Sequence, residues 1–333
     1  MKSIFKIFFS LFILGAISVP VVATVGDAVK TTVKTQFLYL IMGLDDAADN
    51  TDAILMVSYD SADNTAAVVQ MPRDTYCNFG DRLNKINHLY SSYRLAELSK
   101  KDAMRNTADF IGNQLGIEFD GYFAITTQLF KDFIDSIGGV EITLPEEFHY
   151  VSNNANYSFS LKKGKNILDG RKSEIFVRYR NGYSLGDLGR IDIQKIFING
   201  LYNTVSHRVD YDELLKAAAV VGKGAVTDFS VTEFLIMMLK HSSKFRDVEI
   251  SYVTMPGAAI EDASGIWYYI LNKNKSEEVL TKFLFGKSGE FDKEHKFSDI
   301  QKTGFEGIYK SDKIKYKVYK SGNIADINIQ KKN

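Results

Sequence analysis

Residues 36–60 read QFLYLIMGLDDAADNTDAILMVSYD, two apolar segments separated by an acidic loop. The first eight residues are almost entirely apolar, a pattern typical of a strand buried on both faces of a sheet. A loop with four aspartates follows Gly43, and residues 53–60 form a second strand pattern. Residues 66–72 follow a turn of Asp and Asn, so we expect 53–60 and 66–72 to pair as an antiparallel hairpin.

The chain beyond this hairpin alternates strand and helix patterns. We expect strands at 121–127, 140–145 and 249–256, and helices at 101–117, 128–139, 211–222, 230–243 and near 191–206 and 275–285. Residues 73–93 read as irregular. This alternation predicts an α/β fold, a layered α-β-α domain around a mixed central sheet, over residues 30–286. Residues 287–333 are lysine-rich and polar and are expected to form a peripheral C-terminal extension.

Composition excludes several classes of function. The 333 residues contain 41 basic and 41 acidic side chains, so no global field favours nucleic acid, and any anion site must be local. A single cysteine excludes an internal disulfide framework and a cysteine-based zinc cluster. The five histidines are scattered, without a pair at metal-ligand spacing.

The N-terminus predicts a membrane anchor. Residues 7–25 contain no acidic side chain and approach the roughly 20 residues that cross a bilayer. Lys2 and Lys6 should keep residues 1–6 cytoplasmic, which places the following domain outside the cell. A cleaved signal peptide is the alternative, because residues 21–23 resemble a cleavage site, but the long apolar run favours a retained anchor.

Two of three candidate sites follow predicted strands. The loop after residue 43 holds Asp45, Asp46, Asp49 and Asp52, whose carboxylates suit a hard cation such as Mg²⁺, although solvated turn formers explain the same spacing. In residues 71–74, MPRD, Pro72 ends a strand and Arg73 projects from the rim of the sheet beside Asp74. An ordinary surface ion pair is the competing interpretation of that pair.

The third candidate is VRYRNGYSLGDLGRIDIQ, residues 177–194. We expect residues 174–180 to form a strand whose alternation places Arg178 and Arg180 on one face. A helix beginning near residue 189 carries Arg190 and Gln194 at i and i+4. A cation in the first helical turn opposes the helix dipole, which an anion bound at that end would explain. Asp187 and Asp192, as a helix cap and ion-pair partners, support the alternative of a solvated surface.

Together these motifs resemble the LytR-CpsA-Psr (LCP) family over roughly residues 36–206. They occur in family order: MGLD (42–45), Asp52, MPRD (71–74), KIN (85–87), GGVEITLP (138–145), LDG (168–170), VRYR (177–180), GDLGR (186–190) and Gln194. Each piece is weak alone, but the ordered set is specific. The expected membrane anchor with an outside domain also matches the family's topology.

The resemblance implies a metal-dependent phosphotransferase of Gram-positive cell-wall biogenesis. Such an enzyme moves a teichoic acid or capsule-like glycopolymer from a polyprenyl pyrophosphate lipid to a peptidoglycan glycan strand. It implies that Asp45 and Asp52 bind Mg²⁺ or Mn²⁺. The implied pyrophosphate-binding residues are Arg73, Arg178, Arg180, Arg190 and Gln194. Arg73 is also a candidate catalytic residue, with Asp52 or Asp74 as the acceptor of the sugar proton.

The sequence departs from the family pattern at two arginine positions, which Ala47 and Asn50 occupy here. Two rival functions stay open beside the transferase, and the missing arginines support the second of them. A polyprenyl-pyrophosphate phosphatase would use the same groups with water as the acceptor, and a non-catalytic wall-binding or regulatory protein would bind the lipid without turnover.

Overall fold

The computed structural model describes residues 34–46, 50–79, 85–152, 157–180, 187–229, 247–291, 297 and 305–327. The predicted anchor at residues 7–25 and the predicted helix at 230–243 lie outside these described residues. Within the described ranges, no helix combines the length and apolar character needed to cross a bilayer.

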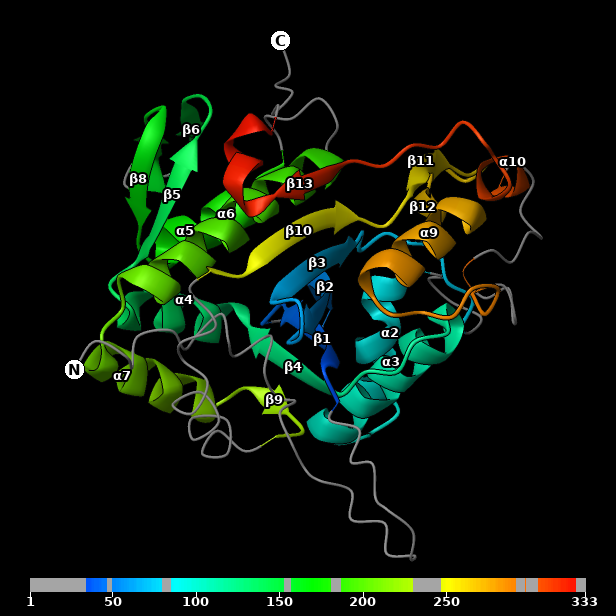
Figure 1. The fold of residues 1–333 in the computed structure, drawn as a ribbon, viewed down its shortest axis with the longest axis horizontal. Coiled ribbons are helices and arrows are strands. Elements are labelled where there is room, and N and C mark those ends of the chain that lie inside the picture. Colours follow the sequence, from blue (N-terminus) through cyan, green and yellow to red (C-terminus); the bar gives the residue numbers. More distant parts are fainter. Residues whose placement is uncertain are drawn as a thin grey trace, which may run out of the picture.

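A mixed seven-stranded sheet forms the centre of the fold, in the order β13-β10-β3-β2-β1-β4-β9 (Figure 1). Its strands are β1 (Gln36–Leu44), β2 (Thr51–Asp60), β3 (Thr65–Met71), β4 (Gly121–Thr126), β9 (Val226–Thr227), β10 (Glu249–Thr254) and β13 (Val318–Lys320). The predicted hairpin is confirmed, because β2 pairs with β3 antiparallel. The sheet is mixed because β1 pairs with β4, and β3 with β10, in parallel.

Alternate residues of β1 build two separate cores, one on each face of the sheet. Phe37, Tyr39 and Ile41 pack in the first core, together with residues of the four helices α4 (Thr127–Ser136), α5 (Gly170–Arg178), α6 (Asp187–His207) and α7 (Tyr211–Gly222). Leu38 and Leu40 belong to the second core. This two-sided burial produces the predicted α-β-α layering.

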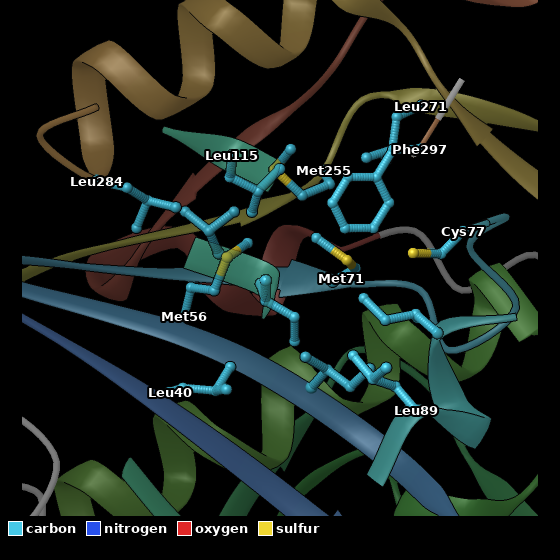
Figure 2. Close-up of a cluster of buried hydrophobic side chains, with 14 of the residues drawn as sticks. Leu40, Met56, Met71, Cys77, Leu89, Leu115, Met255, Leu271, Leu284 and Phe297 are labelled. Atoms are coloured by element: carbon cyan, nitrogen blue, oxygen red, sulfur yellow. The ribbon is translucent and has the colours of Figure 1, made fainter. Parts of the chain in front are cut away.

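The second core lies beneath α2 (Leu89–Leu95), α3 (Lys100–Leu115), α9 (Lys273–Phe283) and α10 (Phe305–Tyr309). Figure 2 shows its centre, where Leu40, Met56 and Met71 of the sheet face Leu115, Met255 and Leu284, with the thiol of Cys77 at one side. Residues 73–93, read from the sequence as irregular, include the short 3-10 helix η1 (Ile86–His88) and α2.

Three two-stranded sheets stand beside the main sheet within the described residues. The strands β5 (Val140–Leu144) and β8 (Gly164–Leu168) pair antiparallel, as do β6 (Phe148–Tyr150) with β7 (Phe159–Leu161) and β11 (Gly257–Glu261) with β12 (Trp267–Leu271). The chain after α10 returns to the central sheet, where β13 pairs with β10 before the 3-10 helix η4 (Ser321–Asp326). This edge strand was not predicted from the sequence.

The prediction of a strand at residues 174–180 is wrong, because these residues belong largely to α5. The side chain of Asp169 accepts the backbone N–H of Lys172 at 2.8 Å and caps the helix. Glu174 and Arg178 then form an i,i+4 ion pair at 3.0 Å. The helix ends at Tyr179, whose backbone is extended (φ −66°, ψ 135°), so Arg180 leaves on a different path from Arg178.

Candidate active site

The site begins where the β1–β2 hairpin meets the end of β3. Antiparallel pairing aligns Ile54 of β2 with Met71 of β3, which brings the start of one strand beside the end of the other. A tight turn follows, in which both the N–H and the hydroxyl of Thr75 donate to the carbonyl of Pro72, at 3.0 and 2.6 Å. Arg73 Nη1 consequently reaches Asp52 Oδ1 at 2.6 Å.

The C-terminal end of α5 supplies a second arginine to the same carboxylate. Arg178 Nη2 lies 3.4 Å from Asp52 Oδ2, while its Nη1 contacts Glu174. Asp52 is thus held between Arg73 and Arg178, which come from chain segments about one hundred residues apart. Both pairings bring together residues that the sequence singled out separately.

The N-terminal turn of α6 completes the cluster around one aspartate. Asp187 Oδ1 lies 2.9 Å from Arg190 Nη2, 3.2 Å from Arg180 Nε and 3.7 Å from Arg73 Nε. The structure therefore gathers the four predicted arginines around Asp52 and Asp187. Asp187, which the sequence suggested only as a cap or ion-pair partner, is the carboxylate shared by three of them.

Arg190 is the most unusual of these groups, because only 1% of its surface is exposed. Burial lowers the pKa of Arg190 to about 10, an effect that Asp187 opposes and that Arg180 and Arg73 reinforce. Burial and the neighbouring Arg73 also lower the pKa of Arg180. The Nε atoms of Arg190 and Arg73 are buried and donate to no acceptor within the described part of the chain. Such donors suit a bound anion.

Gln194 lies one turn further along α6 and bridges two elements. Its amide Nε2 donates to the carbonyl of Val177 at 3.0 Å, and its Oε1 accepts from the buried Gln70 of β3. The sequence assigned Gln194 to the anion directly. In the structure its two polar atoms connect the end of α5 to the central sheet, next to Arg178.

Two further residues extend the site toward η1. Lys85 Nζ contacts Asp74 Oδ1 at 3.1 Å, and Arg73 Nε lies 3.9 Å from the other oxygen of Asp74. The KIN motif was the sequence signal for Lys85. No comparable signal pointed to Gln70 or Glu174, because each acts through a contact with a distant segment.

The aspartate loop flanks the same edge of the sheet. The backbone N–H of Asp45 donates to the carbonyl of Asn50 at 2.9 Å, so Asp45 and Asp52 lie on either side of one hairpin end. His88 Nδ1 contacts the Asn50 side chain at 2.9 Å, and Ser91 donates to it at 3.1 Å. Asp46 accepts the N–H of Gln128 at 3.2 Å. Asp49 and Ala47 lie outside the described residues.

The donor set fits a magnesium ion that shares its coordination with a ligand. Among the residues that the structure describes, no group of three or more His, Cys, Asp or Glu forms a protein cage for a metal. Mg²⁺ is usually held by one or two carboxylates together with substrate phosphates. Two aspartates at one hairpin end, beside an arginine cluster, match that pattern.

An apolar pocket opens from the cluster between the sheet and helices α4, α5 and α6. Its empty space, counted together with the open solvent at its mouth, is about 1240 Å³. Asp52, Glu174, Arg178 and Gln194 stand at its polar end, and the rest of its wall is mainly aliphatic and aromatic: Ile41, Leu55, Val57, Val68, Phe123, Phe130, Phe133, Val177, Phe197, Ile198 and Leu201. The sequence did not locate this pocket. Such a combination of polar and apolar lining suits an amphiphile with an anionic head and an apolar tail.

Known proteins resemble this chain in sequence. The profile of the LytR_cpsA_psr family matches residues 21–283. The polyisoprenyl-teichoic acid–peptidoglycan teichoic acid transferase TagU of Oceanobacillus iheyensis is 24% identical over 244 residues, 72% of this chain and 72% of that protein. The transferase TagV of Bacillus subtilis is 27% identical over 261 residues, 75% of this chain and 64% of TagV.

The fold itself matches solved structures. The crystal structure of Bacillus subtilis TagV superposes with a TM-score of 0.58 at 25% identity, over 74% of this chain and 95% of that one. The family profile spans most of the chain and includes every predicted site residue from Asp45 to Gln194. The protein therefore belongs to the LytR_cpsA_psr family.

Proposed function

We propose that the protein transfers a cell-wall glycopolymer, such as a teichoic acid or a capsule-like polymer, from a polyprenyl pyrophosphate carrier to peptidoglycan. One observation carries this proposal: Arg178 and Asp52, which belong to the arginine cluster and its carboxylates, line an apolar pocket. A pyrophosphate head and a polyprenyl tail need those two environments side by side. The names of the related TagU and TagV transferases support the same class of reaction.

Charge balance supports a divalent cation in the donor complex. The site combines five basic groups (Arg73, Lys85, Arg178, Arg180 and Arg190) with five carboxylates (Asp45, Asp52, Asp74, Glu174 and Asp187). A pyrophosphate diester brings about two further negative charges, which a buried site must neutralise. Asp45 and Asp52 would hold Mg²⁺ or Mn²⁺, which would offset the charge of the phosphate oxygens.

The arginines position the pyrophosphate and stabilise the charge that moves during transfer. A hydroxyl oxygen of the acceptor sugar attacks the phosphorus that carries the polymer. The bond from that phosphorus to the bridging oxygen breaks, and polyprenyl phosphate leaves with the bonding electrons. The product is a phosphodiester between polymer and glycan. Phosphoryl transfer depends mainly on such positioning and electrostatic stabilisation, which the Nε donors of Arg73 and Arg190 can supply.

Asp74 is the better placed of the two candidate proton acceptors. Both oxygens of Asp52 are engaged by guanidinium groups, Oδ1 with Arg73 at 2.6 Å and Oδ2 with Arg178 at 3.4 Å. Asp74 contacts Lys85 through one oxygen and is 3.9 Å from Arg73 through the other. Its second oxygen can therefore accept the hydroxyl proton as the new bond forms.

The proposed location follows from the predicted anchor. Residues 7–25 would hold the protein in the cell membrane, with residues 1–6 in the cytoplasm and the enzymatic domain outside. Both the lipid-linked donor and the peptidoglycan acceptor are accessible from that position.

A binding experiment separates the head and tail of the proposed donor. The full chain in detergent is titrated by calorimetry with polyprenyl pyrophosphate and with inorganic pyrophosphate, each in the presence of Mg²⁺. Ile198→Trp, which narrows the pocket, should weaken only the lipid. Arg190→Ala should weaken both ligands by about tenfold or more, since it removes charged hydrogen bonds.

Because Arg190 is buried, the partly exposed Arg180→Ala serves as a second variant with less risk to folding. Unchanged affinity for both ligands in Arg180→Ala and Arg190→Ala would contradict the proposal. Equal weakening of both ligands by Ile198→Trp would show that the pocket does not hold the tail.

A further inference from the structure

The β11–β12 hairpin adjoins the catalytic edge of the site. The backbone N–H of Tyr269 donates to the carbonyl of Asp74 at 2.8 Å, and the N–H of Tyr76 donates to the carbonyl of Tyr269 at 2.9 Å. Thr75 and Tyr269 form a parallel bridge. Trp267 precedes Tyr269 by two residues on β12, the strand whose Tyr269 contacts the Asp74 backbone.

Trp267 is exposed at this position. Its relative exposure is 54%, and that of the preceding Ile266 is 40%. Isolated exposed apolar residues are common on protein surfaces. Trp267 differs because its strand is hydrogen-bonded to the turn that carries Arg73 and Asp74. The exposed Glu261 faces it across the hairpin in direct register.

The turn between the two strands fixes the backbone that leads into Trp267. Asp262 Oδ1 accepts the N–H groups of Ser264 and Ile266 at 2.8 and 3.0 Å, and the N–H of Asp262 donates to the carbonyl of Ile266 at 2.9 Å. Gly265 supplies the left-handed conformation that this turn requires (φ 78°). A rigid aromatic surface loses little entropy when it binds a ligand.

The apolar pocket and β12 lie on opposite faces of the central sheet. The apolar pocket is lined by residues of the first core, such as Val57, Val68 and Phe123. Tyr268 and Tyr269 of β12 belong to the second core, on the opposite face. Lys85 joins β12 to the reacting edge, with Nζ 5.5 Å from the Tyr268 ring centroid and 3.1 Å from Asp74. The donor lipid and a second substrate can thus reach the phosphate from different sides.

We propose that Trp267 and Glu261 form a subsite for the acceptor glycan strand. The indole face packs against the C–H face of a sugar ring, and the carboxylate accepts hydrogen bonds from sugar hydroxyl or amide groups. This placement delivers an adjacent sugar hydroxyl to Asp74. The inference rests on the proposed transferase function and names the site of its second substrate.

The chain contains one tryptophan, so its fluorescence reports on this subsite alone. The full chain in detergent is titrated with soluble peptidoglycan glycan strands and, as a matched saccharide, with maltooligosaccharides of equal length. We expect a saturable change in tryptophan emission with the glycan strands only. No change, or an equal change with maltooligosaccharides, would overturn the proposal.

Transfer kinetics provide the second measurement. Trp267→Ala should raise the KM for the acceptor glycan about tenfold and leave the KM for the donor lipid unchanged, and Trp267→Phe should recover part of the loss. Tyr157→Ala is the control, because Tyr157 is a comparably exposed aromatic residue (47%) outside the site. An unchanged acceptor KM in Trp267→Ala would overturn the subsite.

Failure of the subsite can be told from failure of the proposed function. Arg190→Ala should weaken binding of the donor by about tenfold or more and keep the fluorescence response to glycan. A glycan response without any transfer by the wild-type chain would support the sugar subsite and contradict the transferase.

Discussion

Arg190 Nη2 donates to Oδ2 of Asp187, one turn earlier on α6, at 3.1 Å, and Oδ1 of the same carboxylate lies 3.2 Å from Arg180 and 3.7 Å from Arg73. A single carboxylate therefore offsets three guanidinium groups in a largely buried setting. This explains how the chain keeps a dense cluster of positive charge folded before any anion arrives, since unpaired buried charges are costly.

Asp187→Asn should destabilise the fold and strengthen anion binding. Loss of the shared carboxylate leaves Arg190 buried without its partner, which should lower the free energy of unfolding by about 2 kcal/mol. The remaining positive charge should make inorganic pyrophosphate, without Mg²⁺, raise the melting temperature more than in wild type. Differential scanning calorimetry measures both effects.

Asp102→Asn is the matched control, because Asp102 and Arg105 form an exposed i,i+3 pair at 3.4 Å. This variant should lower the free energy of unfolding by less than about 1 kcal/mol. The rise in melting temperature caused by pyrophosphate should stay the same as in wild type. A smaller pyrophosphate effect in Asp187→Asn than in wild type would rule out this role for Asp187.

Gln194→Ala should lower kcat/KM by more than the loss of folding stability alone would cause. The variant removes the bridge from Gln70 to the end of α5, which positions Arg178. Small displacements of positioning groups can cost about 100-fold in rate, so kcat/KM should fall about 10- to 100-fold. Gln114→Ala, at an equally buried glutamine (6%) on α3, should lower stability without changing kcat/KM. Similar kcat/KM values in the two variants would exclude a positioning role.

Tyr179 should determine where the two flanking arginines point. Its ring packs edge-on against Phe148 and Tyr150, with centroid distances of 5.1 and 5.9 Å. Because its backbone is extended, side chains on either side of Tyr179 project away from that aromatic cluster. Tyr179→Phe should keep near-wild-type activity, whereas Tyr179→Ala should lower kcat/KM about tenfold. Equal activity of the two variants would contradict this function of the ring.

His88 should make stability depend on pH just below neutrality. Burial lowers the pKa of His88, helped by Lys85 and Arg73 and opposed by Asp74. The unfolded chain then binds more protons than the folded one near the ordinary pKa of 6.5. The folded state consequently loses stability as the pH falls through that value toward the lower folded pKa.

Urea unfolding of wild type and His88→Gln at several pH values between about 5 and 8 isolates this effect. The stability of wild type relative to the variant should increase with pH. A constant difference, or one that decreases with pH, would show that His88 does not carry the dependence.

The sequence predicted the sheet better than the elements around the site. The apolar run of residues 37–43 and the turn before residue 66 depend on local chemistry, and both the buried strand and the hairpin are confirmed. The prediction of a strand at 174–180 failed because the apolar residues Ile175 and Val177 alternate with other side chains over a short segment. Such a short alternation resembles a strand even where the chain is helical. The Asp169 cap and the Glu174–Arg178 pair decided for a helix.

The site residues were recognisable as motifs, but their roles depend on distant contacts. Asp187 became the shared partner of Arg73 and Arg180 only through the approach of α6 to the β3 turn. The pocket wall combines strands, α4, α5 and α6, and no local pattern describes such a surface. The proposed role of Trp267 likewise depends on a bridge between two segments that are distant in the sequence.

We propose that the arginine cluster holds the pyrophosphate of a lipid-linked polymer during transfer to glycan. The direct measurement incubates the full chain with a defined polyprenyl-pyrophosphate-linked saccharide, Mg²⁺ and peptidoglycan glycan strands, and follows polyprenyl phosphate and glycan-linked saccharide by mass spectrometry. Both products should form together and only with glycan present, and Arg180→Ala and Arg190→Ala should lose about 10³-fold in rate. Full activity in these two variants, or release of phosphate products without glycan, would contradict the account.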